Sequence, residues 1–449
     1  MGSDSARSHP DHVEHPSGVR VWPRNVHRGP EGGLKVGALS LDRIADQFGT
    51  PAFVLDEAEF RGRCREFRDA FPEAKVYYAG KAFLCRAVAA MAHQEGLGVD
   101  VCSGGELTVA LSAGVPPETI TMHGNNKSLE ELERATALGV GTIVVDSFEE
   151  VARLTAIARR RGVRPGVMVR VMPGVEAHTH ELVATAHDDQ KFGLSLRDGS
   201  AEAAISGIIS DGVLQMRGLH CHVGSQIFDS SAHELAATRV LALYARFGMP
   251  DGGPWPELNL GGGFGISYTT AEEPVSLCDF AAALEKVIGQ ECATLRIPHP
   301  QLVIEPGRAI VGPSMLTLYR VGTVKPRPGL RTYVSVDGGM SDNIRTALYD
   351  ATYTATIANR TSTVAPVPTR VVGRHCESGD IVVREARLPG DVRSGDLLAV
   401  AATGAYCRGM ASNYNHTPRP PVLAVNHQGV RAVVRRETDA DLMNLDVGP

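Results

Sequence analysis

The sequence predicts a (β/α)8 barrel followed by a mostly antiparallel β-domain that also takes in the N-terminal segment. Eight strand-like runs alternate with amphipathic helical segments over roughly 230 residues, which is typical of a closed barrel. From about Val311 the helical periodicity fades, and short β-rich runs alternate with turn residues. The chain has 449 residues, which is enough for two domains.

The eight strand-like runs are short and mostly apolar. They cover Lys75–Ala79, Gly98–Cys102, Thr119–His123, Thr142–Asp146, Val167–Val171, Met216–His222, Glu257–Leu260 and Gln301–Ile304. Helical segments are expected between most of them, for example at 129–138, 148–160, 233–246 and 278–291. An open doubly wound sheet is the competing interpretation. Such a sheet usually has fewer strands and a Gly-rich turn after its first strand, where this chain has Lys81.

Four ranges describe the expected organisation. They are a disordered tail (1–18), an N-terminal segment that packs on the β-domain (19–50), the barrel (51–310) and the β-rich domain (311–449). A helix at 41–47, a strand at 52–55 and a helix at 57–71 precede the first barrel strand. The β-rich domain has expected strands at 332–336, 365–372, 380–384, 397–401 and 422–425.

Composition excludes several classes of function. The 45 basic and 51 acidic residues give no long basic run, so nucleic acid and anionic membranes are poor partners. No apolar stretch reaches the roughly 18 residues of a membrane span, and we expect the protein in the cytoplasm. The eight cysteines are dispersed, which argues against a disulfide framework or a structural zinc site. The irregularly spaced His9, His12 and His15 are interpreted as part of a solvated tail, so no metal is expected.

A lysine ends the first expected barrel strand. The apolar, aromatic run from Val76 is followed at once by Lys81. Burial at a strand end desolvates a lysine and disfavours its charged form, which leaves a nucleophilic amine suited to a Schiff base. A solvated surface lysine is the alternative, and it is the commoner case.

Other polar residues also fall at strand ends, where barrels of this type carry their chemistry. Asp100, His123, His220, His222 and the segment Glu305–Arg308 all follow expected strands. The run from Gly261 to Gly263 follows the seventh strand, and its backbone N–H groups can approach an anion closely. The loops after the seventh and eighth strands are the usual phosphate site of this fold, although a glycine run can also be a plain turn.

A phosphate site, a reactive lysine and a carboxylate at one barrel mouth together describe a pyridoxal phosphate site. Glu305 would face the pyridine nitrogen and keep it protonated, because an adjacent anion raises the affinity for that proton. His222 could stack on the ring, with Asp100 orienting it. Strand alternation does not separate His220 from His222, and either one could instead be a hydrogen-bonded core histidine.

The ordered motifs resemble those of bacterial diaminopimelate decarboxylases, a family of the alanine-racemase-like pyridoxal phosphate enzymes. The resemblance runs from about Val21 to Leu442. It is carried by YYAGKAF, DVCSGGEL, HGNNKS, EAHTH with DQKFGLS, HVGSQI, LGGGFGISY, EPGRAIVG, VDGGMSDNIRTALY, GRHCESGD, ATGAYC and SNYN. Gly80 departs from the pattern, because many relatives have alanine before the lysine.

The resemblance implies roles for individual residues. Lys81 carries pyridoxal 5'-phosphate, His222 stacks on it and Glu305 contacts its nitrogen. The phosphate would be held around Ser225, Gly262, Gly263, Gly307, Arg308 and Tyr406. The resemblance also implies that Cys376, Glu377 and Ser378 enter the site of a partner subunit, so that the active form is a homodimer.

Decarboxylation is favoured over racemisation. The alanine racemases of the same fold class place an arginine against the ring nitrogen, whereas Glu305 supports a stronger electron sink. The reaction needs a proton donor, and a thiol near a cationic lysine titrates close to neutral pH, which suits Cys376. A buried structural thiol is the alternative, but Glu377 and Ser378 are too polar for buried neighbours.

Substrate choice is expected to rest on the second domain. Arg308 and Arg345 can bind a carboxylate, the hydroxyls of Tyr349 and Tyr406 can add hydrogen bonds, and Glu377 can pair with an ammonium. A substrate with both a distal ammonium and a distal carboxylate has the shape of meso-2,6-diaminopimelate, whereas ornithine lacks that carboxylate.

The expected activity is therefore loss of carbon dioxide from meso-2,6-diaminopimelate to give L-lysine, the last step of lysine biosynthesis. Its restriction to the D-centre is implied by the resemblance alone. A decarboxylase of another basic amino acid and a non-catalytic cofactor-binding protein are the alternatives. The long segment 176–191 could be a lid that excludes water.

Overall fold

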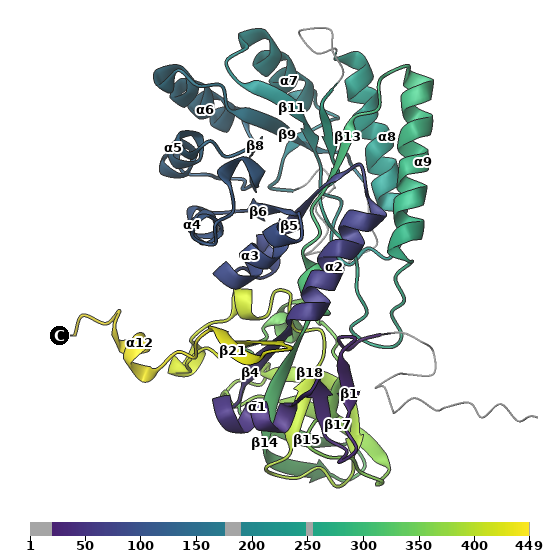
Figure 1. Cartoon of the computed structure of the whole chain (residues 1–449), viewed down its shortest axis with the longest axis vertical. Helices are drawn as coiled ribbons and strands as arrows, with labels where there is room; N and C mark the ends of the chain where they lie inside the picture. Colours follow the sequence, from purple (N-terminus) through teal and green to yellow (C-terminus); the bar gives the residue numbers. More distant parts are fainter. Residues whose placement is uncertain (1–19, 176–189, 248–254, 449) are drawn as a thin grey trace, which may run out of the picture. The chain divides into compact units, whose positions relative to one another are not determined.

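The computed structural model describes residues 20–175, 190–247 and 255–448, and it forms two compact units (Figure 1). The barrel unit contains residues 61–266 and 274–311. The β unit contains the chain up to Phe60, residues 267–273 and the chain from Gly312 onward. The expected tail (1–18) and most of the expected lid (176–191) lie outside the described residues.

The barrel unit is a closed ring of parallel strands, as the sequence predicts. Its strands are β5 (Lys75–Ala79), β6 (Gly98–Val101), β7 (Ile120–Met122), β8 (Thr142–Val145), β9 (Gly166–Met172), β11 (Gln215–His220), β12 (Glu257–Asn259) and β13 (Gln301–Ile304). Pairing of β13 with β5 and of β8 with β9 closes the ring. A short strand, β10 (Leu194–Ser195), pairs with β9 outside it.

Helices alternate with the barrel strands (Figure 1). They are α2 (Glu57–Ala70), α3 (Arg86–Gln94), α4 (Gly104–Ser112), α5 (Leu129–Leu138), α6 (Phe148–Arg161), α7 (Ser200–Asp211), α8 (Ser231–Arg246), α9 (Leu277–Leu295) and α10 (Arg308–Val311). Local sequence sets their ends. Ser128 and Glu131 form a capping box at the start of α5, and Gly139 ends that helix in the left-handed conformation. Helix α7 begins after Gly199, which has no capping side chain.

The β unit is built on a mostly antiparallel sheet with the order β18-β17-β15-β14-β4-β20-β21. These strands are β4 (Ala52–Asp56), β14 (Met315–Arg327), β15 (Arg331–Val336), β17 (Pro366–Val372), β18 (Ile381–Pro389), β20 (Val422–Asn426) and β21 (Gly429–Val434). Two further strands, β16 (Ala355–Ile357) and β19 (Leu397–Val400), pair with each other, and β19 also pairs with β14. The pairs β15–β17 and β4–β20 are parallel.

Strand β4 differs from the expected division of the chain, which begins the barrel at residue 51. It pairs with β14 on one side and with β20 on the other, so it lies in the sheet of the β unit. All five of its residues are buried, and a strand buried in this way needs a partner on each edge. The β unit supplies both partners.

The N-terminal segment packs within the β unit. Its strands β1 (Val26–Arg28), β2 (Leu34–Val36) and β3 (Leu39–Ser40) form a small sheet of their own, followed by α1 (Leu41–Phe48). One hydrophobic cluster joins Trp22 and Ile44 of this segment to Leu316 and Leu397 of the main sheet. Among the described helices, none has the length and apolar character that a bilayer crossing requires.

Candidate active site

The carboxyl ends of the barrel strands carry a dense group of polar residues. Asp100 lies on β6, His123 follows β7, His220 ends β11, Asn259 ends β12 and Glu305 follows β13. All five side chains are buried, with exposed fractions between 1% and 6%. Buried polar groups at this density require mutual hydrogen bonds, and the strand ends provide them.

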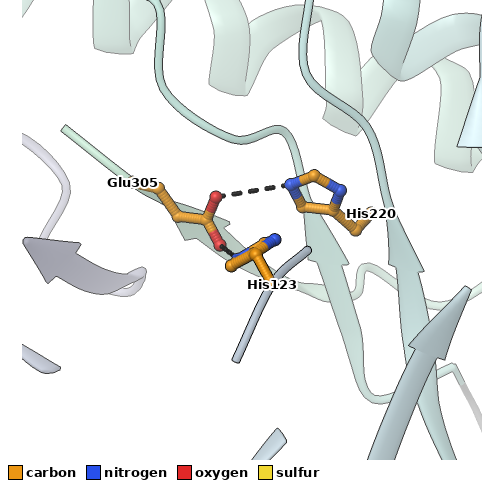
Figure 2. A group of neighbouring side chains, drawn as sticks. All are labelled: His123, His220 and Glu305. Carbon is orange, nitrogen blue, oxygen red and sulfur yellow. Dashed lines mark hydrogen bonds and ion pairs between the residues drawn. The ribbon is translucent and has the colours of Figure 1, made fainter. Parts of the chain in front are cut away.

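Glu305 lies at the centre of this group and accepts three hydrogen bonds. His123 Nε2 and Asn259 Nδ2 contact its Oε1 at 2.8 Å and 2.7 Å, and His220 Nε2 contacts its Oε2 at 3.3 Å. Figure 2 shows the two imidazole rings directed at the carboxylate from separate strand ends. Burial opposes ionisation of Glu305, but its interactions with His123 and His220 outweigh burial and hold its pKa well below the ordinary value. The group is therefore a buried anion.

The structure separates His220 from His222, which the sequence pattern does not. His220 contacts Glu305, whereas His222 Nδ1 accepts a hydrogen bond from the backbone N–H of Gly262 at 3.2 Å. Burial is the main cause that lowers the pKa of His220 to about 3 and the pKa of His222 well below its usual value. Both imidazoles are consequently neutral near pH 7.

Asp100 lies beside His123, with 3.8 Å between Asp100 Oδ1 and His123 Nε2. Burial raises the pKa of Asp100, and the interaction with His123 opposes that rise. Its Oδ2 is buried and has no hydrogen-bond partner in the described part of the chain. A buried oxygen in this state is ready to accept a hydrogen bond from a bound molecule.

Lys81 lies in a 3₁₀ turn, η1 (Gly80–Ala82), immediately after β5. Its side chain is exposed, so the desolvation expected from the sequence is wrong for the described chain. The reason is local, because the lysine follows the buried strand instead of forming part of it. Its positive charge still acts on the strand-end group, since it lowers the pKa of Asp100 and of His222.

The glycine run follows β12 and passes close to neighbouring backbone. Gly261 and Gly263 have φ angles of 68° and 104°, which favour glycine. A Cβ on Gly262 would lie 2.4 Å from the carbonyl oxygen of Glu305. No larger residue fits there, so the run presents bare backbone at the strand ends.

The loop after β13 approaches the lysine turn from the other side. A Cβ on Gly307 would lie 2.9 Å from both the Cβ and the carbonyl oxygen of Ala79. The Arg308 guanidinium donates a hydrogen bond to Ser225 Oγ at 2.7 Å. The predicted residues Ser225, Gly307 and Arg308 therefore belong to the same barrel mouth as Lys81.

His123, His220 and Glu305 also have the composition of a metal site. One donor atom from each lies within 4.8 Å of the others. The hydrogen bonds from the two imidazoles to the carboxylate account for this spacing without an ion (Figure 2).

The remaining predicted residues lie in the β unit. Arg345 and Tyr349 lie on a short helix, α11 (Arg345–Tyr349). Arg345 is 5% exposed, donates a hydrogen bond to Tyr353 Oη at 2.5 Å and lies 4.7 Å above the ring of Tyr268. Its guanidinium is thus held within an aromatic pair.

Cys376 and Glu377 are exposed on a loop whose backbone is held by hydrogen bonds to buried side chains. Asp380 accepts hydrogen bonds from the backbone N–H groups of His375 at 2.7 Å and Met340 at 2.6 Å. The ring of His375 contacts Ser341 Oγ at 2.8 Å through Nε2. These bonds fix the backbone while the thiol stays accessible.

Tyr406 has a φ angle of 60°, which is uncommon for a residue with a side chain. It lies in the β unit, like Cys376, and belongs to the turn 404–407.

Three residues of the barrel mouth have no role in the sequence prediction. His123 and Asn259 both contact Glu305, and His233 of α8 contacts the carbonyl oxygen of Gly262 at 2.8 Å. Asn259 offered a signal, because it is a polar residue near the end of a short strand and two residues before the glycine run. His233 offered none, since a histidine on a helix face has no pattern of its own.

Comparison with known proteins agrees with this geometry. Residues 57–312 match the family model described as "Pyridoxal-dependent decarboxylase, pyridoxal binding domain". The chain is 52% identical over 436 residues to the diaminopimelate decarboxylase of Mycobacterium tuberculosis, covering 95% of this chain and 98% of that protein. It is 43% identical over 420 residues to that of Bacillus subtilis, covering 93% and 95%.

A solved structure is similar over nearly the same length. The diaminopimelate decarboxylase from M. jannaschii in complex with L-lysine has a TM-score of 0.88 and 30% identity, covering 95% of this chain and 98% of that chain. The fold and the strand-end site thus define a pyridoxal-dependent decarboxylase. Within that class, the chain belongs to the diaminopimelate decarboxylase family.

The cofactor of this family is pyridoxal 5'-phosphate, and the barrel mouth fits it. The glycine run presents backbone without side chains at the strand ends, which suits a phosphate. Glu305 is a buried anion suited to a protonated ring nitrogen, and the unpartnered Oδ2 of Asp100 adds an acceptor beside it. Lys81 supplies an accessible amine at the same mouth.

Proposed function

We propose that this chain releases carbon dioxide from meso-2,6-diaminopimelate and forms L-lysine. The observation that carries the proposal is the ionised Glu305, held by His123, His220 and Asn259 at the barrel mouth that also presents Lys81. The relatives named above bear the name of this activity and match nearly the whole chain.

The residues of the barrel unit would hold the cofactor. Bound pyridoxal phosphate supplies a ring that accepts the electron pair left when a carboxylate departs as carbon dioxide. Lys81 would bind it through its amine, and Glu305 would keep a proton on its ring nitrogen. The neutral ring of His222 would give a flat contact surface, because its Nδ1 is fixed by the N–H of Gly262.

The phosphate would be held by the loops after β11, β12 and β13. Gly263 and Gly307 would offer backbone N–H groups at positions where side chains do not fit, and Gly262 lies between Gly261 and Gly263 with its own N–H directed at His222 Nδ1. Ser225 and Arg308 would add a hydroxyl and a guanidinium from the same mouth, and Tyr406 a second hydroxyl. Asp100 would accept a hydrogen bond through its Oδ2.

Residues of the β unit would handle the proton and the substrate. Cys376 would deliver a proton to the carbon that loses the carboxylate, and its exposed thiol on a fixed loop suits that task. Arg345 would bind the distal carboxylate, and Glu377 would pair with the distal ammonium. Tyr349 and Tyr406 would add hydroxyl contacts.

A homodimer with shared sites is part of the proposal. The loop with Cys376 and Glu377 is exposed in the single chain, and a rigid exposed loop can complete a site in a second copy. The cytoplasmic location expected from the sequence stays a prediction.

The direct test incubates the purified protein and pyridoxal phosphate with meso-diaminopimelate and measures carbon dioxide and lysine. We expect lysine from the meso isomer, no turnover of ornithine, and no product from Lys81→Ala. Turnover of ornithine with none of diaminopimelate would overturn the substrate assignment. A colourless protein after soaking in pyridoxal phosphate would overturn the cofactor role of Lys81.

Shared sites are tested by mixing inactive variants. Lys81→Ala and Cys376→Ala each inactivate the enzyme if both residues act in catalysis. Random mixing of the two subunits yields mixed dimers with one intact site, so about a quarter of the original activity should return. Activity that stays absent after mixing would place both residues in the same subunit's site.

A further inference from the structure

Asn259 is a buried side chain of the barrel mouth that uses both its amide nitrogen and its amide oxygen in hydrogen bonds. It has no proposed role in the chemistry. It ends β12 and is 1% exposed. Its Nδ2 donates to Glu305 Oε1 at 2.7 Å, and its Oδ1 accepts a hydrogen bond from the backbone N–H of Gly261 at 2.8 Å. One amide thus contacts both the buried carboxylate and the glycine run.

These contacts belong to a closed set of hydrogen bonds. The backbone N–H of Glu305 donates to the carbonyl oxygen of Gly261 at 2.8 Å. Glu305 is therefore joined to Gly261 through its backbone and to Asn259 through its side chain, while Asn259 is joined to Gly261. A shift of any one of these three residues stretches its hydrogen bonds to the other two.

The amide is the chemical group that satisfies both contacts. A carboxylate accepts a hydrogen bond and a backbone N–H donates one, so the residue between them must donate on one side and accept on the other. An aspartate would place a second carboxylate against Glu305, and an aliphatic residue would leave both buried partners short of a hydrogen bond.

The glycine run has a second anchor that does not involve Glu305. His233 of α8 is fully buried, and its Nε2 donates to the carbonyl oxygen of Gly262 at 2.8 Å. Its ring stacks on Phe264 with 5.5 Å between ring centroids. His233 contacts only the glycine run, whereas Asn259 contacts both the glycine run and the carboxylate of Glu305.

We propose that Asn259 is a positioning residue that sets Glu305 and the glycine run at a fixed spacing from each other. The inference rests on the proposed roles of Glu305 toward the ring nitrogen and of the glycine run toward the phosphate. One side chain then positions the groups that would contact the ring nitrogen and the phosphate of the cofactor.

Four variants of the full-length protein separate this role from a merely structural one. Asn259→Ala removes both contacts, Asn259→Asp keeps the shape and changes the charge, and His233→Gln disturbs only the anchor of the run. Asn426→Asp is the matched control, because Asn426 also donates to a glutamate, Glu57, at 3.0 Å but lies in the β unit. Far-UV circular dichroism and thermal unfolding check that each variant folds.

Two spectroscopic signals are read on each variant after titration with pyridoxal phosphate. The phosphorus resonance of the bound cofactor reports the phosphate environment, and the visible absorbance reports the ring. We expect Asn259→Ala to change both signals and to weaken cofactor affinity about tenfold or more. His233→Gln should change the phosphorus resonance and leave the visible band in place. Asn426→Asp should change neither.

Asn259→Asp gives a result that depends on pH. Two adjacent carboxylates raise the pKa of the pair, so at low pH a shared proton replaces the lost N–H donor. As pH rises through that raised pKa the proton leaves, and cofactor affinity should fall at least tenfold relative to its value at low pH. Affinity of the unmodified protein should show no such fall over the same range.

Several outcomes overturn the inference. They are an Asn259→Ala variant that changes only one of the two signals, and an Asn259→Asp variant whose affinity for pyridoxal phosphate follows the unmodified protein at every pH. Should Asn259→Ala not fold, the pH profile of the folded Asn259→Asp variant decides alone. An unmodified protein that binds no cofactor would instead contradict the proposed function, so the two failures are distinct.

Discussion

The backbone N–H of Gly262 points at Nδ1 of His222 across 3.2 Å, which fixes that nitrogen as a hydrogen-bond acceptor. His222 must then carry its proton on Nε2, and the ring is neutral. Burial is the first cause of its low pKa, and the positive charges of Lys81 and Arg170 lower it further. The imidazole ring is uncharged, and its hydrogen bond to the glycine run sets its orientation.

A flat apolar ring should therefore replace His222 better than a small side chain. His222→Phe should keep most of the affinity for pyridoxal phosphate, and His222→Ala should lose up to about tenfold, because stacking contributes about 0.5–1.5 kcal/mol. Titration of each variant by visible absorbance measures this. Equal losses in the two variants would show that the imidazole itself, and not its face, is required.

The charge of Glu305 should matter more than its shape. Glu305→Gln keeps the size of the side chain and removes the anion, so kcat should fall by about 100–1,000-fold while the protein stays folded. Release of carbon dioxide from meso-diaminopimelate gives kcat. Glu285→Gln is a control, because Glu285 also contacts a histidine, His299, at 2.9 Å but is 59% exposed. Near-normal kcat in Glu305→Gln would argue against its place beside the ring nitrogen.

Stability of the barrel unit should depend on Lys127. Its Nζ is 2.6 Å from Glu150 and also donates to the carbonyl oxygens of Gly124 and Val144 at 2.7 Å, and its side chain is 1% exposed. Lys127→Met removes the ammonium from three buried acceptors, so the free energy of unfolding should fall by about 3–5 kcal/mol.

Urea unfolding compares Lys127→Met with Glu133→Ala, which breaks an exposed pair with Arg161. The exposed pair should contribute little, because solvent screens it. A loss in Lys127→Met no larger than the loss in Glu133→Ala would refute the prediction.

Asp342 should make the β unit less stable as pH rises. Burial, with a smaller contribution from the nearby Asp337 and Asp380, raises the pKa of this carboxyl to about 7. Its unfolded pKa is about 3.9. Between these two values the folded state holds a proton that the unfolded state has released, so the free energy of unfolding falls by about 1.4 kcal/mol per pH unit.

The fall should begin near the unfolded pKa of Asp342 and level off above the folded one. Asp342→Asn removes the titration and should flatten that part of the profile. Unfolding midpoints measured in urea at a series of pH values between these limits test this, with the unmodified protein alongside. A parallel slope in both proteins would assign the pH dependence to other groups.

The barrel strands and the site residues at their carboxyl ends could be predicted from the sequence, because apolar runs and their polar boundaries mark each strand. The run ending at Ala79 and the run ending at Ile304 are apolar and bounded by polar residues, and both are strands as expected. Glu305, His222 and the glycine run then fall at the barrel mouth, because parallel strands share one carboxyl edge.

Long-range pairing is what the sequence could not reveal. Strand β14 (Met315–Arg327) is the longest strand among the described residues and is not one of the strands named from the sequence, and its second half is mostly exposed. The place of β4 depends on partners more than 200 residues away. The exposure of Lys81 and the double contact of Asn259 arise from where chain segments meet, and no periodicity encodes that.

The position of β4 between β14 and β20 has a consequence for biosynthesis. During translation, residues 52–56 leave the ribosome long before residues 422–426, which form one of their two neighbours. All the barrel strands can therefore be synthesised and pair before β20, the second partner of β4, has left the ribosome. A nascent chain halted before residue 422 would carry an open sheet edge, and such an edge invites aggregation until synthesis is finished.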